Sequence, residues 1–256
     1  MEYSNNNNNL KNGIKNPHNI LIFDTETTGL LPRNISVTKY NESVPEIIQL
    51  SWIIYNINTN KIISQNNHLI KIKGKNHPKA FETHGISDKM SKDYGKPIKE
   101  ILGLFLEDVK ISHLLVAHNI EFDKKIIQIE CIRNYGHNAL MDQEFVEYCT
   151  MLKGYRHTDV YYHIKSSRTG ELIKRKKNPK LMELHEALFN SIPNNLHDAY
   201  IDILVCFRCM YYMLYKKDPL YNGVTAENIL RETKKTKYVE DIDFREIFNK
   251  YCGLND

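Results

Sequence analysis

Short apolar runs that alternate with amphipathic segments constrain the fold of this 256-residue chain more than any other feature. The first run, NILIFD (19–24), precedes two longer strand candidates, EIIQLSWIIYN (46–56) and KIISQNNHLIKI (61–72), which the turn NINTN joins as a hairpin. From Pro97 onward, apolar residues recur at the i, i+3, i+4, i+7 spacing of an amphipathic helix with proline in its first turn. The pattern therefore predicts helices packed on a sheet.

Strands and helices keep alternating along the second half of the chain. They are predicted at HLLVAH (113–118, strand), 120–136 (helix), EFVEYCT (144–150, strand), from Pro179 (helix) and at about 198–215 (helix). The last helix is apolar nearly all round, so we expect it to lie buried against the sheet. We therefore predict an α/β fold with a mixed sheet and helices on both faces.

The two ends of the chain depart from this pattern. Residues 1–17 contain five consecutive asparagines and are too polar to pack, so we expect a disordered tail. The alternating part, 18–216, is expected to form one domain. Residues 217–256 contain helical stretches around 226–235 and 243–251, and we expect a helical extension packed on or flanking that domain.

Composition narrows the class of protein. The five cysteines are scattered, so neither a disulfide scaffold nor a zinc ribbon is indicated, and the lone CxxC of Cys206 and Cys209 lies in an apolar helical pattern. The N-terminus lacks the apolar core of a signal peptide, and no run approaches the roughly 20 apolar residues of a membrane span. We expect a soluble, intracellular protein of the cytoplasm or nucleus. The net charge of +4 suits a polyanionic partner without specifying one.

Two acids end the first apolar run, in LIFDTETTGL (21–30). Residues i and i+2 of a strand point to the same face, so Asp24 and Glu26 are expected to project together. Neighbouring carboxylates repel each other unless a cation neutralises them, and hard oxygen ligands without a nearby cysteine favour Mg²⁺ or Mn²⁺ over zinc. An exposed strand end with acids and hydroxyls in a turn explains most such pairs, so this motif alone is weak evidence.

Two further segments place acids at the starts of helices. In AHNIEFD (117–123), Asp123 falls in the first turn of a helix that leaves a strand end, although a favourable interaction with the helix dipole would explain it equally well. In HDAYID (197–202), we expect His197 on the loop before the last helix and Asp202 in its first two turns. Taken alone, His197 is better explained by a structural role. Four acids and a histidine together supply what two-metal phosphoryl transfer requires: ligands for two divalent ions about 4 Å apart and a base that titrates near neutrality.

The segments FDTETTG, AHN with FD, and HDAxxD resemble, in order, the three motifs of the DEDDh 3′-to-5′ exonucleases, the group that includes the proofreading subunit of bacterial replicative polymerase. The resemblance spans about residues 19–215. It implies a ribonuclease H-like fold with a five-stranded mixed sheet. It also implies hydrolysis of the terminal phosphodiester at a 3′ end, with release of nucleoside 5′-monophosphates.

The same resemblance implies a role for each motif residue. Asp24 would bridge both metal ions, Glu26 and Asp202 would complete the catalytic one, and Asp123 would support the second, partly through water. His197 would be the general base. Variants of the wider family carry a tyrosine four residues before the last acid, and this chain has an aspartate there, which favours the histidine branch.

Neighbouring residues resemble positions that line the substrate cleft in this family. On the loop after the acids, Gly29 permits close backbone approach and Leu30 can wedge beside a base. For His84 and Leu30, ordinary packing is an equally good explanation. The expected substrate-binding residues are Thr27, Thr28, Gly29, Leu30, His84 and Asn119.

Two segments are longer than in a minimal domain of this family. KSSRTGELIKRKKNPK (165–180) is polar and strongly basic, and three interpretations stay open: a solvated loop, a phosphate-contacting arm, or a nuclear-localisation signal. The connection 31–45 is also long. Each segment could alter substrate choice or recruit a partner.

We therefore expect a 3′-to-5′ exonuclease with two Mg²⁺ or Mn²⁺ ions per active site, acting on a nucleic acid with a free 3′ end. DNA with a single-stranded or frayed end is the favoured substrate. The alternatives are an exoribonuclease of the same fold and a non-catalytic module that binds nucleic acid or docks on a polymerase. A polymerase or another replication protein is a candidate partner. The sequence leaves open the oligomeric state and the choice between proofreading, repair, degradation and RNA trimming.

Overall fold

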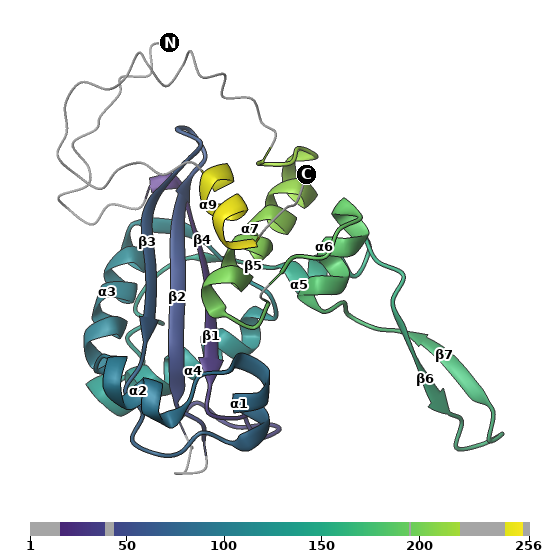
Figure 1. The fold of residues 1–256 in the computed structure, drawn as a ribbon, viewed down its shortest axis with the longest axis horizontal. Helices are drawn as coiled ribbons and strands as arrows, with labels where there is room; N and C mark the ends of the chain where they lie inside the picture. Colours follow the sequence, from purple (N-terminus) through teal and green to yellow (C-terminus); the bar gives the residue numbers. More distant parts are fainter. Residues whose placement is uncertain (1–15, 39–43, 195, 221–243, 253–256) are drawn as a thin grey trace.

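A computed structural model describes residues 16–38, 44–194, 196–220 and 244–252 (Figure 1). The tail at 1–15 and the helical stretch expected around 226–235 lie outside these residues. The main strands are β1 (Asn16–Thr27), β2 (Ile47–Asn56), β3 (Lys61–Leu69), β4 (Ser112–Ala117) and β5 (Val146–Cys149). β1 is longer than the run 19–24 that predicted it, and it begins inside the expected tail.

The five strands form one mixed sheet in the order β3-β2-β1-β4-β5. β2 runs antiparallel to β1 and to β3, whereas β1, β4 and β5 are parallel to one another. This confirms the predicted five-stranded mixed sheet. Because β1, β4 and β5 are parallel, their carboxyl ends meet at one edge of the sheet, the lower edge in Figure 1.

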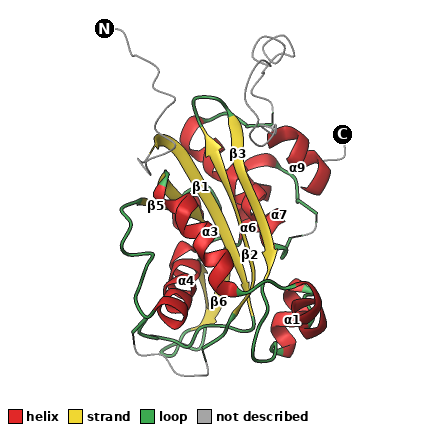
Figure 2. Ribbon diagram, turned by 90° about the vertical axis from the view of Figure 1, so that its left-hand side faces the viewer, coloured by secondary structure: helices red, strands yellow, loops and turns green. Residues whose placement is uncertain are grey.

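Helices cover both faces of the sheet, as expected (Figure 2). Side chains alternate across β1, so Ile20 and Ile22 join the core on one face and Leu21 and Phe23 join the core on the other. The helices of the first face are α6 (Leu181–Phe189), α7 (Ala199–Tyr215) and α9 (Phe244–Cys252), and those of the second are α3 (Ile98–Lys110) and α4 (Ile120–Tyr135).

The helix expected at 243–251 is α9, and it packs on α7. Phe244 and Phe248 are buried in the same core as the α7 side chains. Beside them, the buried Arg208 donates to Asp218 (2.6 Å), and its guanidinium lies 3.9 Å from the centroid of the Phe189 ring. The cysteines are all buried and free, which confirms that Cys206 and Cys209 belong to the core. Among the described residues, no helix has the length and hydrophobicity needed to cross a bilayer.

The basic segment 165–180 is not simply a loop. The segment begins at the last residue of strand β6 (Tyr161–Lys165) and contains the whole of strand β7 (Leu172–Lys176). These two strands form an antiparallel hairpin, which projects from the body of the molecule in Figure 1. Every residue of both strands except the last of β7 is exposed, so the sequence shows none of the apolar alternation that marks a half-buried strand. The sequence also did not reveal three short helices: α1 (Pro78–His84), α2 (Asp88–Tyr94) and α5 (Thr150–Gly154).

Candidate active site

Three carboxylates converge where β1 ends. The strand alternation that points Ile22 toward α7 also points Asp24 and Glu26 to that side, where the first turn of α7 carries Asp202. One ligand oxygen from each of Asp24, Glu26 and Asp202 lies within 4.8 Å of the others. Acids from two elements therefore share one small volume.

The fourth acid approaches from the opposite face of β1. Thr25 lies between the two strand acids and points toward α4, whose first turn carries Asp123. The Oδ1 atom of Asp123 accepts hydrogen bonds from the Thr25 backbone N–H (3.1 Å) and from the Thr25 hydroxyl (2.7 Å). Asp123 is only 3% exposed, so these two bonds fix its position relative to the other acids.

The loop before α7 brings His197 beside this group. His197 is exposed and lies in the left-handed region (φ 74°), and its backbone N–H is 3.4 Å from the Oδ1 of Asp202. The next residue, Asp198, caps the helix by accepting from the N–H of Tyr200 at 2.8 Å. Gln49 of β2 lies 3.4 Å from the same oxygen of Asp198. The expected arrangement, with the histidine on the loop and the acid in the first helical turns, is confirmed.

The acids suppress one another's ionisation. Burial, and then repulsion from Asp123, Asp202 and Glu26, raises the pKa of Asp24 well above its usual range. Burial likewise raises the pKa values of Glu26, Asp123 and Asp202, although the hydrogen bonds from Thr25 offset part of the effect on Asp123.

Such a group of acids is suited to holding a cation. Carboxylate oxygens at this spacing are the donors that hard divalent ions prefer, and a bound cation would relieve the repulsion between them. The chemistry of the donor set therefore fits Mg²⁺ or Mn²⁺.

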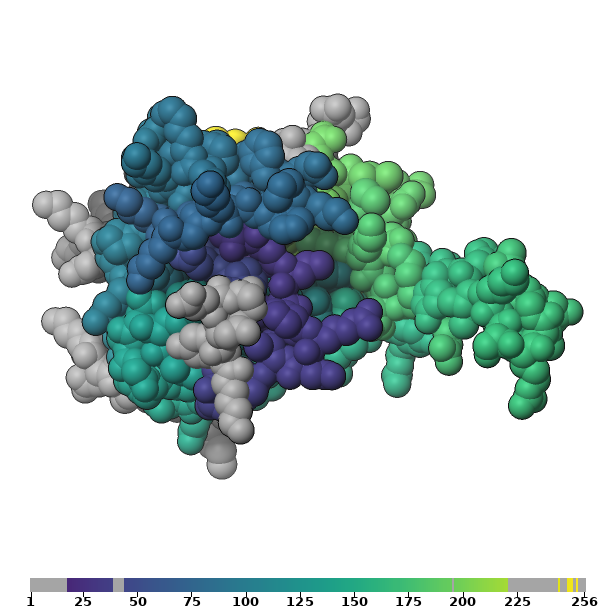
Figure 3. Space-filling model, turned by 90° about the horizontal axis from the view of Figure 1, so that it is seen from below, coloured from purple at the N-terminus to yellow at the C-terminus, as the bar shows by residue number. Residues whose placement is uncertain are grey.

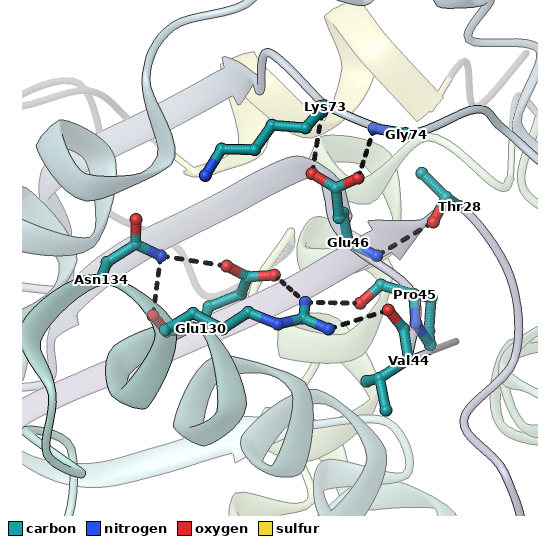
Figure 4. Close-up of polar contacts among 9 residues, drawn as sticks. Thr28, Val44, Pro45, Glu46, Lys73, Gly74, Glu130 and Asn134 are labelled. Atoms are coloured by element: carbon teal, nitrogen blue, oxygen red, sulfur yellow. Dashed lines mark hydrogen bonds and ion pairs between the residues drawn. The ribbon is translucent and has the colours of Figure 1, made fainter. Parts of the chain in front are cut away.

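The loop after β1 is tied to the start of β2 (Figure 4). Thr28 and Glu46 exchange two hydrogen bonds: the N–H of Thr28 donates to the carbonyl of Glu46, and the N–H of Glu46 donates to the hydroxyl of Thr28, both at 2.9 Å. The Glu46 carboxylate accepts in turn from the backbone N–H groups of Lys73 (2.9 Å) and Gly74 (2.7 Å). This network holds the backbone of the loop close to the acids.

Residues of helix α4 extend the same hydrogen-bond network to the segment before Glu46. Arg133 donates to the carbonyls of Pro45 (3.0 Å) and Val44 (2.9 Å), and the nearly buried Glu130 accepts from Arg133 at 2.6 Å. Asn134 donates to Glu130 as well (3.1 Å), as Figure 4 shows. The guanidinium thereby fixes the two residues that precede Glu46.

The expected substrate-binding residues differ in exposure. Thr27 is buried, whereas Leu30 is 87% exposed and packs on little of the protein. The interpretation of Leu30 as a packing residue is therefore wrong. His84, the last residue of α1, accepts from the N–H of Ile86 at 3.0 Å and contacts the backbone of Thr27, and burial lowers its pKa. Asn119 is exposed at the N-terminus of α4 in the left-handed conformation (φ 70°).

Seen end-on, the lower surface is hollowed between three segments (Figure 3). These are the residues that follow β1, drawn in purple, the region of α1, in blue, and the region of α7, in light green. Two of these segments adjoin elements that carry acids, since β1 carries Asp24 and Glu26 and the first turn of α7 carries Asp202.

Comparison with known proteins agrees with this geometry. A family model described as RNase_T, exonuclease, matches residues 21–210, which contain Asp24, Glu26, Asp123 and Asp202. The chain belongs to this exonuclease family. A search of curated protein sequences gave no match.

Solved structures show the same fold as this chain. E. coli Exonuclease I in complex with a dT13 oligonucleotide is 14% identical, with a TM-score of 0.57 over 78% of this chain and 41% of that one. Exonuclease I from Methylocaldum szegediense is 17% identical, with a TM-score of 0.54 over the same shares, 78% and 41%. The match thus spans about two fifths of these longer proteins, and it confirms the expected ribonuclease H-like fold.

Three residues that organise the site were not predicted. Thr25 holds Asp123, Asp198 adds a further negative charge near Asp24 and Glu26, and Gln49 links β2 to the start of α7. A signal existed for Asp198, because an aspartate directly before a helical pattern is a typical N-cap. No local signal existed for Gln49, since its role depends on the pairing of β2 beside β1.

Proposed function

We propose that this protein is a divalent-metal-dependent 3′-to-5′ exonuclease of the DEDDh type, which releases nucleoside 5′-monophosphates from a nucleic acid with a free 3′ end. The observation that carries the proposal is the convergence of Asp24, Glu26 and Asp202 within 4.8 Å, with Asp123 held beside them. DNA is the favoured substrate. The support for DNA comes from the similar structures, which include Exonuclease I with dA13, dA16 and dT13 oligonucleotides.

The four carboxylates would hold the metal ions. Asp24, Glu26 and Asp202 form the group that would hold one ion, and Asp123 would help to hold a second from the α4 side. When bound, two divalent ions supply Lewis-acid charge stabilisation for the in-line displacement at phosphorus. A zinc-bound form of E. coli Exonuclease I with single-stranded DNA is among the similar structures, which supports a metal site in this fold.

His197 would take the proton from the attacking water. Its place on an exposed loop, two residues before α7, lets the side chain swing over the carboxylates once a substrate is present. The backbone bond between its N–H and Asp202 keeps the loop next to the acids. An imidazole is suited to this task because its ordinary pKa lies near neutrality.

The loop from Thr27 to Leu30 would receive the terminal nucleotide. Thr28 and its partner Glu46 hold the backbone rigid, and Gly29 lets a sugar or base approach closely. Leu30, which is exposed, would stack against the terminal base, and His84 and Asn119 would supply further contacts to the substrate. These contacts orient the 3′ end rather than read its sequence.

The test is a time course with 3′-labelled and 5′-labelled single strands of DNA and RNA of one sequence, with Mg²⁺, Mn²⁺ or EDTA. We expect stepwise shortening from the 3′ end that EDTA abolishes, with the faster strand identifying the substrate. The control is Asp24→Asn, which keeps the shape of the site but removes one of its negative charges and should stop cleavage. Faster cleavage of RNA would favour the exoribonuclease alternative. Binding without any cleavage by the parent protein would refute the exonuclease proposal and favour a non-catalytic module.

A further inference from the structure

The β6–β7 hairpin concentrates positive charge on a surface that the proposed chemistry does not use. Between Tyr161 and Lys177 the only acid is Glu171. The basic residues in the same span are Lys165, Arg168, Lys174, Arg175, Lys176 and Lys177. Like charges held this close repel one another, so such an arm gains stability from an anionic ligand.

The two faces of the hairpin differ in chemistry. The register pairs Tyr161 with Lys176, His163 with Lys174 and Lys165 with Leu172, and paired residues share a face. This face carries three lysines, a tyrosine and a histidine. The other face carries Tyr162, Ile164, Ile173 and Arg175.

The basic face combines cations with aromatic rings. The Nζ of Lys174 lies 3.9 Å from the centroid of the Tyr161 ring, and both side chains are exposed. Lys176 pairs with Asp159 at 3.2 Å, whereas neither Lys165 nor Lys174 belongs to an ion pair among the described residues. Unneutralised lysines beside stacking surfaces are the combination with which proteins hold single-stranded nucleic acid.

The base of the hairpin is fixed to the edge of the sheet where the acids gather. The N–H of Lys177 donates to the carbonyl of Val160 (3.0 Å) and closes the base, while its Nζ lies 2.7 Å from the carboxylate of Glu183 on α6. His118, directly after β4, donates through Nε2 to the carbonyl of Pro179 at 3.1 Å. The arm is therefore anchored next to the loop that leads into α4 and Asp123.

The direction of the arm suits a strand that leads to the site. In Figure 1 the hairpin leaves α5 and α6 and descends toward the same end of the molecule as the carboxyl end of β1. In the end-on view of Figure 3, the part of the chain that contains the hairpin extends well beyond the hollow. A strand whose 3′ end lies among the acids can thus continue toward the arm.

We propose that the basic face of the β6–β7 hairpin binds the phosphate backbone of the nucleic acid several nucleotides away from the 3′ end. Lys165, Lys174 and Lys176 contact phosphates, and Tyr161 stacks on a base. The proposal deepens the proposed function and rests on it for the position of the 3′ end. The binding itself requires no hydrolysis.

The first test measures binding alone, with Asp24→Asn protein in EDTA and a fluorescent single-stranded 20-mer of DNA, over a series of salt concentrations. The test variant also carries Lys165→Gln, Lys174→Gln and Lys176→Gln. Its matched control carries Lys92→Gln, Lys99→Gln and Lys110→Gln, which remove the same charge from α2 and α3. We expect the test variant to bind at least about tenfold more weakly at low salt, and the slope of log K against log salt to flatten by about 2, since each lost phosphate contact contributes about 0.7.

A second variant separates the two faces. Arg175→Gln removes one charge from the other face of the same hairpin and should weaken binding much less than Lys174→Gln. Circular dichroism and the thermal midpoint show that each variant is folded. Equal binding by the test variant and the α2/α3 control would overturn the proposal. The basic face of the hairpin would then be assigned to contact with a protein partner.

The second test uses the active protein with a trimer and a 20-mer. If the hairpin binds several nucleotides away from the 3′ end, as proposed, a trimer lacks the nucleotides that contact it. The lysine variant should then hydrolyse the trimer at the parent's rate, while its KM for the 20-mer rises about tenfold. If the parent hydrolyses neither strand but the binding slope still changes as expected, the exonuclease proposal fails and the arm proposal stands. If the lysine variant lost cleavage of the trimer and of the 20-mer to the same extent, this would contradict the proposal that the hairpin binds the distant part of the strand.

Discussion

The buried carboxylates should make the stability of the metal-free protein fall as the pH rises. Burial and the neighbouring acids raise the pKa of Glu26 from 4.5 to about 9. In the folded protein Glu26 therefore keeps its proton at pH values where the unfolded chain has released it. The contribution of Glu26 to the free energy of unfolding is fully present below its unfolded-state pKa of about 4.5. It is lost as the pH rises through its folded-state pKa of about 9.

The size of the effect follows from proton linkage. Each pH unit over which only the folded state holds the proton costs about 1.4 kcal/mol. From pH 5.5 to pH 7.5, Glu26 alone would lower the free energy of unfolding by up to about 3 kcal/mol. For a chain of this size, that corresponds to a thermal midpoint about 5–10 °C lower.

Differential scanning calorimetry in EDTA measures this directly. Glu26→Gln cannot ionise, so its midpoint should change less between the two pH values than that of the parent. Glu144→Gln, in the exposed loop before β5, is the matched control and should follow the parent. Addition of Mg²⁺ should raise the parent's midpoint more at pH 7.5 than at pH 5.5. If parent and Glu26→Gln lose the same stability over this range, the carboxylates are not destabilised by one another and the reasoning is wrong.

Three other changes test separate parts of the structure. Thr25→Val keeps the shape of the side chain but removes the hydroxyl that donates to Asp123. A hydrogen bond to a charged group contributes about 1.5–3 kcal/mol, so kcat should fall about 10- to 100-fold in a metal-saturated assay. An unchanged kcat would exclude a positioning role for Thr25. His197→Ala should lower the rate about 10²- to 10⁴-fold at saturating metal, the usual contribution of a general base; an unchanged rate would assign the base elsewhere. Phe248→Ala empties a fully buried position between α9 and α7, so the free energy of unfolding measured in urea should fall by about 3–5 kcal/mol. A fall of less than about 1 kcal/mol would show that α9 contributes little to the core.

The sequence was sufficient to predict the framework of the site. The apolar run before Asp24 fixes a strand, and its period of two directs Asp24 and Glu26 to one face. The helix starts of α4 and α7 carry Asp123 and Asp202, and the order of the strands brings these starts to the same edge. Each of these features is set by local pattern and by the rules for parallel strands.

What the sequence did not reveal depends on contacts between distant segments. Thr25 was passed over because a threonine within a strand is common, and only the approach of α4 gives its hydroxyl a partner. The hairpin of β6 and β7 was described as a basic loop because both of its faces are exposed, so no apolar alternation marks its strands. Its strands pair with each other rather than with the main sheet.

Helix α4 connects two parts of the site that are separate in the sequence. Its first turn carries Asp123, and its last turn carries Arg133, which fixes Val44 and Pro45 and, through Glu46, the loop at Thr28. Adding or deleting one residue between Asp123 and Arg133 would rotate one relative to the other by about 100° and shift it by about 1.5 Å along the axis. The length of α4 therefore cannot change by a single residue without uncoupling the position of Asp123 from that of the loop at Thr28.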